Sequence, residues 1–427
     1  MPSNPTGRNA VTDWFARHAV PLTTLDPDAP LDDLEPLRGI IGDARVVAVG
    51  ENAHFIHEFS LARQRILRFL AERCGFTLFA HESGFSEGLA LDPWVQGAGD
   101  ETDLTQINEA ADSWGHGDLL RYIRRHNTTS GRPVRFAGID VPQAGGSLLP
   151  ALIPVAAYLR DIDPDILPVA ESAIAMAERI AGGSVASAAP DWAKLGTAEQ
   201  DALTAALTRL KLRFQALEPL YTSRSDRDHY DAAFWRLEAA LHTDDTLRGM
   251  AALFDGSALP ADLSVRDRYM AESVQWHLSR SAPGTRMVLA AHNNHIQKHP
   301  VAYDGHLTTL PMGQHLDRAL GEDYVALALT STADHTVEMY PDADAPLGFT
   351  IADTALAPPE PDSVEAAALD AGVGLALVDL RHARHSDRLL SLTSIRTQSS
   401  TMTMPVADAF DSVLISPTAT MQAGIGV

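Results

Sequence analysis

The sequence has little cysteine and few basic residues. Cys74 is the only cysteine in 427 residues, so the chain cannot form an internal disulfide bond. It closes a helical pattern beside Gly75, a position typical of a structural thiol rather than of a nucleophile. Lys and Arg together number 33 against 56 Asp and Glu, which gives a formal net charge of -23. This charge argues against nucleic acid or an anionic membrane surface as a partner.

Long apolar runs and common cofactor motifs are also missing. No apolar stretch reaches the length of a membrane span, and the first residues, MPSNPTGRNAVTDWF, lack the basic and apolar regions of a signal peptide. The sequence contains no P-loop, no G-x-G-x-x-G and no H-E-x-x-H motif. We therefore predict a soluble cytoplasmic protein without a cofactor, and a divalent metal ion is the one alternative left open.

Short apolar runs alternate with helical patterns along most of the chain. We predict buried strands at 45–49, 77–80, 134–137, 287–291, 324–330 and 374–380. Between the strands, apolar residues at helical spacing mark helices, among them 58–73 and 115–127. This alternation predicts an α/β fold with a mainly parallel sheet flanked by helices.

The interval 150–280 breaks the alternation, because it shows helical periodicity and no convincing strand. We predict helices at about 197–217, 228–241 and 264–280, the first opened by a capping box of Thr197 and Gln200, and a loop at 181–196. This interval is expected to form a helical insertion near the carboxyl ends of the strands.

The chain then divides into three parts of one catalytic domain. Residues 1–150 form the first part of the α/β core, 151–280 the helical insertion, and 281–427 the rest of the core with a C-terminal tail. The Ser-, Thr- and Met-rich stretch after about Thr393 gives no clear pattern.

Ionisable residues directly follow four of the predicted strands. The stretch GENAHFIHE (50–58) follows the first strand, and HES, GID and HNNH follow three others. Because ligands bind at the carboxyl ends of parallel strands, these four segments should meet at one site. The candidate site residues are Glu51, His54, Glu82, Asp140, His292 and His295.

Arg63 belongs to the same group. It lies between Phe59 and Ile66 on the apolar stripe of its helix. A buried guanidinium needs a carboxylate partner, which Glu51 or Glu82 could supply. The alternative is that Arg63 extends to solvent.

Some of the candidate site residues also have a simpler, structural explanation. His81 alternates with Glu82, so only one of them should face the site, and we favour Glu82. Asp140 could instead cap a turn, His295 could lie outside the site, and His116 in SWGHGD could line the pocket or merely begin a helix.

Two motifs suggest other chemistry. GFSEG (84–88) matches the nucleophile elbow G-x-S-x-G, and Ser86, Asp140 and His292 have the chain order of an α/β-hydrolase triad. However, HES separates this motif from its strand, and SGFSEGLALDPWV has a helical pattern, so we do not favour Ser86 as a nucleophile. HNNHIQKH contains a loose H-x-x-H, which is too common to indicate a metal.

Five segments together resemble the erythromycin esterase family. They are GENAH (50–54) followed by Arg63, Glu82 with the helix after it, RDRYMAESVQW (266–276), AHNNH (291–295) and MGQHLDRALGEDYVALAL (312–329). The likeness runs in order over roughly residues 40–335. It implies an α/β core with a helical insertion and a deep cleft.

The resemblance also implies a reaction, the hydrolysis of a macrolide lactone without a covalent Ser intermediate. His54 would be the general base that activates water, and Glu51, Arg63 and Glu82 would hold the charges of the site. His292 and His295 would bind the carbonyl group or protonate the leaving alkoxide.

The substrate-binding wall is expected to include Phe55, His116 and Asp140. Phe55 follows the motif histidine, where the family usually has a glycine. This change would reshape the pocket.

Three other functions are weighed against hydrolysis of a lactone or complex ester. His54 could act as a base in a transesterification, rearrangement or elimination on a polyketide-like product. Glu51, Glu82, His54 and His292 could instead hold a metal ion for a metal-dependent hydrolase. The fourth is a binding protein without activity. In each case the partner is a small molecule, and the oligomeric state is not assigned.

Overall fold

An eight-stranded sheet runs through the molecule in the order β1-β11-β14-β8-β2-β5-β3-β4. The structure is a computed structural model and describes residues 10–108, 114–303, 306–381, 392–423 and 425. The strands of the sheet are β1 (Ala19–Pro21), β2 (Val46–Val49), β3 (Leu78–Gly84), β4 (Arg135–Asp140), β5 (Met287–Ala290), β8 (Tyr324–Ser331), β11 (Ala376–Asp379) and β14 (Ser412–Ser416).

Six neighbouring strands, from β14 to β4, are parallel. Only the far edge differs, because β11 runs antiparallel to β14 and β1 antiparallel to β11. The predicted mainly parallel α/β fold is therefore confirmed. All six predicted strands are present, and β14 comes from the C-terminal stretch that showed no clear pattern.

The helices and the smaller hairpins complete the fold. The helices are α1 (Ala10–His18), α2 (Glu35–Ile41), α3 (His57–Cys74), α4 (Phe85–Val95), α5 (Leu104–Ile107), α7 (Gly117–Thr129), α8 (Leu149–Ile162), α9 (Leu167–Ala177), α10 (Val185–Lys194), α11 (Thr197–Ala216), α12 (Glu218–Arg224), α13 (Arg227–Asp255), α14 (Ser264–Ser279), α15 (Asn293–Ile296), α16 (Met312–Leu320), α17 (Val364–Ala371) and α18 (Val406–Ala409). The hairpins pair β6 (Val301–Tyr303) with β7 (His306–Thr309), β9 (His335–Pro341) with β10 (Phe349–Ala355), and β12 (Ser394–Thr397) with β13 (Ser400–Thr403).

Hydrophobic cores cover both faces of the sheet, as the pleat of β2 shows. Val47 and Val49 belong to the core that contains residues of α2 and α3. Val46 and Ala48 point to the opposite face and join the core that contains residues of α14 and α16. A strand buried on both faces needs a continuous apolar run rather than an alternating one, which is why VVAV was recognisable.

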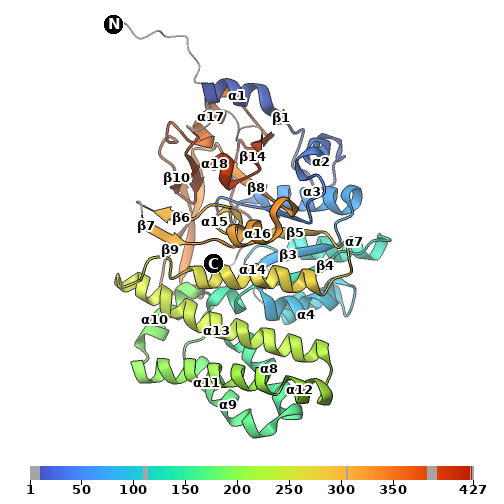
Figure 1. Cartoon of the computed structure of the whole chain (residues 1–427). Helices are drawn as coiled ribbons and strands as arrows, with labels where there is room; N and C mark the ends of the chain where they lie inside the picture. Colours follow the sequence, from blue (N-terminus) through green and yellow to red (C-terminus); the bar gives the residue numbers. More distant parts are fainter. Residues whose placement is uncertain (1–9, 109–113, 304–305, 382–391, 424, 426–427) are drawn as a thin grey trace.

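The helices α8 to α13 form a unit with a third core of their own (Figure 1). Phe85 of α4 and Tyr269 of α14 are part of this core, so these two helices join the insertion to the β4 side of the sheet. Among the described residues, no helix combines the length and the apolar character needed to cross a membrane.

The predicted loop at 181–196 is wrong, because it contains α10. Ser184 caps this helix, and its Oγ accepts a hydrogen bond of 3.0 Å from the backbone N–H of Ala186. The capping box of α11 also differs by one residue: Gly196 is the N-cap, and its N–H donates to Oε2 of Glu199. Short helices rich in small residues carry too little periodic signal to be separated from loops.

Candidate active site

A cavity of about 410 Å³ opens at the carboxyl ends of β2, β3 and β5. This is the edge at which ligands bind in parallel sheets. The residues that line it include Glu51, His54, Arg63, Glu82, His292 and His295. The structure therefore brings together six of the residues that the sequence selected, although they come from segments far apart in the chain.

Glu51 is the carboxylate partner of Arg63. Nη1 of Arg63 lies 2.9 Å from Oε2 of Glu51, and its Nη2 donates to the carbonyl oxygen of Ala291 at 2.7 Å. Arg63 is buried and thus ties the end of β2 to the end of β5. Burial raises the pKa of Glu51, but the charge of Arg63 and the hydrogen bond from His54 outweigh it and lower the pKa to about 2.

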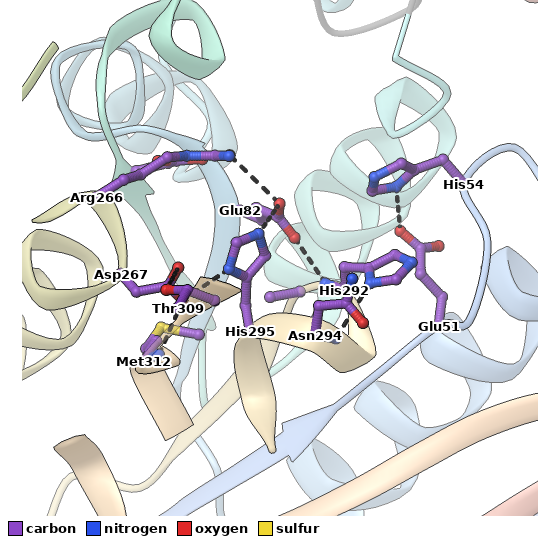
Figure 2. A network of polar contacts seen from close by, with 12 residues as sticks. Glu51, His54, Glu82, Arg266, Asp267, His292, Asn294, His295, Thr309 and Met312 are labelled. Atoms are coloured by element: carbon purple, nitrogen blue, oxygen red, sulfur yellow. Dashed lines mark hydrogen bonds and ion pairs between the residues drawn. The ribbon is translucent and has the colours of Figure 1, made fainter. Parts of the chain in front are cut away.

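His54 is oriented by Glu51. Its Nδ1 lies 2.8 Å from Oε1 of Glu51 (Figure 2). Since an ionised carboxylate only accepts hydrogen bonds, Nδ1 carries a proton and Nε2 is the basic atom. Burial lowers the pKa of His54, but the hydrogen bond and the charge of Glu51 raise it above its ordinary value.

His292 lies beside His54 as a neutral hydrogen-bond donor. The two ring centroids are 5.0 Å apart. Nδ1 of His292 accepts a hydrogen bond of 3.1 Å from the backbone N–H of Asn294, at the start of α15. Burial and the nearby His54 lower the pKa of His292 to about 3. The neutral ring therefore has its proton on Nε2 and can donate it to an oxygen atom.

A glycine is required directly before Glu51. A Cβ atom on Gly50 would come within 1.8 Å of Oδ1 of Asn293. Asn293 cannot easily move, because its Nδ2 donates to the carbonyl oxygen of Leu329 in β8 at 2.9 Å. The G-E-x-x-H and A-H-N-x-H motifs thus fit each other in space.

His295 is held by two carboxylates. Its Nδ1 lies 2.7 Å from Oδ1 of Asp267, and its Nε2 lies 3.3 Å from Oε1 of Glu82 (Figure 2). Burial lowers the pKa of His295, but Asp267 and Glu82 raise it to about 10. Two carboxylates thus hold the ring of His295, which lines the cavity, and its expected part in binding the carbonyl group or protonating the leaving alkoxide stays a prediction.

Glu82 contacts His292 with one carboxylate oxygen and His295 and Arg266 with the other. Its Oε2 accepts a hydrogen bond of 2.6 Å from the backbone N–H of His292. Its Oε1 lies 3.5 Å from Nη2 of Arg266, on the side of His295. Burial raises the pKa of Glu82, but His295, His54 and Arg266 together lower it well below its ordinary range. Glu82 is therefore an ionised group that fixes the backbone of His292.

The substrate-binding role expected for Asp140 needs a correction. Asp140 is fully buried and does not line the cavity. Its two carboxylate oxygens accept hydrogen bonds of 2.9 and 2.5 Å from Nε and Nη2 of Arg266. Asp140 thus holds Arg266, and Arg266 and Glu82 line the cavity while Asp140 lies behind them. Arg266 and Asp267 were quoted only as part of a family-like helix, and their charge on a buried helix face was the signal that could have identified them.

Both His81 and Glu82 line the cavity, whereas strict alternation along β3 allowed only one. The pairing of β3 with β4 shifts its register between His81 and Gly84, and such an irregularity breaks the two-residue period. His116 also lines the cavity, with its ring centroid 4.6 Å from that of His81.

Phe55 belongs to an aromatic wall of the cavity. Its ring stacks on Trp114 at a centroid distance of 5.9 Å, and Trp114 meets Phe349 edge to face at 5.7 Å. The backbone φ of Phe55 is 63°, in the left-handed region that favours glycine. A glycine would suit this backbone conformation, and Phe55 adopts it while it adds a ring. Trp114 and Phe349 had no sequence signal.

Ser86 lies outside the site. It is buried in α4 and is not among the residues that line the cavity. Cys74 at the end of α3 does not line it either. The strand β3 ends at Gly84 and α4 begins at Phe85, so Ser86 lies inside a helix with a negative φ and not in the strained turn of a nucleophile elbow.

The C-terminal segment completes the His54 loop, defined here as residues 50–56. The N–H of His57 donates to the carbonyl oxygen of Thr420 at 2.8 Å, and the N–H of Gln422 donates to that of Phe55 at 2.8 Å. The N–H and Oγ1 of Thr420 both donate to the carboxylate of Glu58, each at 2.7 Å. These contacts join residues more than 360 positions apart, and no local sequence pattern predicts them.

Comparison with known proteins identifies the family of this chain. A family model described as erythromycin esterase matches residues 71–419. The chain is 36% identical to erythromycin esterase type II of Escherichia coli over 406 residues, which cover 94% of this chain and 96% of the relative. It is 33% identical to erythromycin esterase type I of Escherichia coli over 397 residues, covering 92% and 95%.

The fold also matches a solved structure of the same kind. A mutant of the erythromycin esterase EreC in its open conformation superposes with a TM-score of 0.88 at 32% identity, over 96% of this chain and 99% of the other. The chain belongs to the erythromycin esterase family and is an esterase-type hydrolase.

Proposed function

We propose that this protein hydrolyses the ester bond of a macrocyclic lactone by direct attack of water, without a covalent enzyme intermediate. The observation that carries the proposal is the pair of imidazoles in the cavity. His54, oriented by Glu51, offers a basic Nε2, and the neutral His292 beside it offers an Nε2–H donor.

The two rings can perform the reaction in two steps. Nε2 of His54 takes a proton from water while the water oxygen bonds to the ester carbonyl carbon, and Nε2–H of His292 donates a hydrogen bond to the resulting oxyanion. The intermediate then breaks its bond to the alkoxide, which receives the proton from His54. The products are a carboxylic acid and an alcohol on the opened ring, so one water molecule is consumed.

The cavity suits a large, partly apolar ester. A volume of about 410 Å³ falls in the range of small-molecule sites, and the wall of Phe55, Trp114 and Phe349 supplies apolar surface. The relatives are named erythromycin esterases, and erythromycin is therefore the first substrate to test.

We further propose that the reaction needs no metal ion. Both carboxylates of the site are already engaged by cationic partners, Glu51 by Arg63 and Glu82 by His295 and Arg266. Among the described residues, no group of three or more His, Cys, Asp or Glu side chains is arranged to hold a metal. Treatment with a chelator should leave the rate unchanged, and restoration by a divalent ion would contradict this proposal.

The reaction type can be tested with a panel of macrolactones that includes erythromycin. We expect a product heavier than the substrate by one water molecule. In heavy-oxygen water under single-turnover conditions, the label should appear in the product carboxylate, because water attacks the substrate directly. The measurement is mass spectrometry of product and protein.

Three outcomes would contradict this proposal. Label in Glu51 or Glu82 with unlabelled product would show a covalent carboxylate intermediate. A product of unchanged mass would indicate rearrangement, and a product lighter by water would indicate elimination.

The pH dependence of kcat/KM should reflect the protonation of His54. The base acts only when deprotonated, so kcat/KM should fall as the pH drops through the pKa of His54, which Glu51 holds above its ordinary value. In Glu51→Gln the neutral amide no longer stabilises the imidazolium, and this falling limb should move to lower pH at a reduced maximum rate. A profile of kcat/KM against pH checks the shift, and an unmoved limb in a folded variant would show that another group titrates.

A further inference from the structure

The tip of the β12–β13 hairpin enters the cavity. Thr397 pairs with Ser400 as the last pair of the hairpin, so Gln398 and Ser399 form a two-residue turn. Ser399 is exposed, whereas Gln398 lines the cavity together with His54 and His292.

Two backbone hydrogen bonds of this turn and one side-chain hydrogen bond of the preceding Thr397 fix its position. The N–H of Gln398 donates to the carbonyl oxygen of Asn52 at 2.7 Å, within the His54 loop. The N–H of Ser399 donates to Oε2 of Glu338 at 2.8 Å. Oγ1 of Thr397 donates to Oδ1 of Asn294 at 3.3 Å. The turn is therefore attached to both segments that carry the two imidazoles.

Gln398 is an unfavourable residue for this turn. Its φ is 50°, in the left-handed region where Gly and Asn are preferred in two-residue hairpins. A longer side chain in this conformation costs stability, and such strain concentrates at binding and active sites. The conformation of the turn therefore gives no reason for a glutamine at position 398.

The side-chain amide of Gln398 has no partner in the part of the chain that the structure describes. Both Nε2 and Oε1 are buried, and neither makes a hydrogen bond. A buried donor and a buried acceptor that are both left open are costly, and each such group calls for an explanation. A ligand in the cavity would satisfy both.

We propose that the amide of Gln398 binds the substrate, pairing its N–H with a carbonyl or hydroxyl oxygen and its Oε1 with a hydroxyl hydrogen. The ligand class is a hydroxylated ester in which a donor and an acceptor lie side by side, as in a hydroxy lactone. This inference rests on the proposed ester hydrolysis. Gln398 is a specificity residue and takes no part in proton transfer, which belongs to His54 and His292.

The test uses two variants that separate binding from folding. Gln398→Gly removes the amide and relieves the positive φ, and Gln398→Leu removes the amide but keeps the bulk. For erythromycin, both should raise KM about tenfold, the effect of losing a hydrogen bond to a buried polar group, with little change in kcat. The melting temperature should stay the same or rise, most of all in Gln398→Gly. Ser399→Ala, the exposed neighbour, should change neither quantity.

Two outcomes would overturn the proposal. An unchanged KM in Gln398→Gly would show that the amide does not contact substrate. A melting temperature that falls in step with activity would show a structural role. Calorimetric binding of erythromycin separates this inference from the proposed hydrolysis: if wild type binds without making product, hydrolysis fails, and weaker binding by Gln398→Gly would still support the binding role.

Discussion

We expect His54→Ala to lose about 10³-fold in kcat/KM toward its ester substrate while the protein remains folded, because general base catalysis by a positioned histidine is worth about 10²–10⁴-fold. Glu51 would lose its hydrogen bond to Nδ1 but keep its ion pair with Arg63 at 2.9 Å, so the charge balance of the site survives. The loss should lie in kcat, since the imidazole acts on water. Steady-state kinetics with product detection by mass spectrometry measures it.

Two controls make this result specific. Ser86→Ala should keep the wild-type rate, because Ser86 is buried in α4 away from the cavity. His229→Ala removes an exposed histidine that is paired with Asp226, and it should also keep the wild-type rate. If Ser86→Ala were as inactive as His54→Ala, direct attack of water would have to be abandoned for a covalent route.

The largest loss of stability should follow from Arg266→Met. Asp140 is fully buried and would be left without the guanidinium that donates to both of its oxygens. Removing one partner of a buried ion pair costs about 3–5 kcal/mol in the free energy of unfolding. Glu82 would also lose a cation at 3.5 Å, so activity should fall as well. Denaturant unfolding of the purified variant gives the free energy directly.

The same helix offers a matched control for this variant. Arg268, two residues further along α14, forms an exposed ion pair with Glu272, and Arg268→Met should cost about 0–1 kcal/mol. The double variant Asp140→Asn with Arg266→Met should recover much of the lost stability, because no buried charge remains unpaired. A stable but inactive Arg266→Met would instead mean that Arg266 binds substrate.

Much of the sheet and of the site could be predicted from local sequence patterns. The strands buried on both faces appear as apolar runs, and parallel pairing brings the residues that follow them to one edge. This argument places Glu51, Glu82 and His292 at one cavity without any knowledge of their contacts.

Local patterns could not assign partners or roles. Arg63 had two candidate carboxylates, and only the folded structure shows that its partner is Glu51. The spacing of its motif does not show whether His295 has an ion-pair partner, because that partner, Asp267, lies in another helix, α14. The irregularity in β3 that follows His81 lets both His81 and Glu82 line the cavity, which strict alternation excluded.

The contacts of Thr420 and Gln422 with the His54 loop also set the order in which this enzyme can be completed. The strand and helix on either side of the loop are synthesised first, but the hydrogen bonds that close the loop come from residues that follow more than 360 positions later. The ribosome therefore has to pass Gln422 before the base can take its final place. A nascent chain stalled before Thr420 would carry every proposed catalytic side chain and still hold an unfinished site.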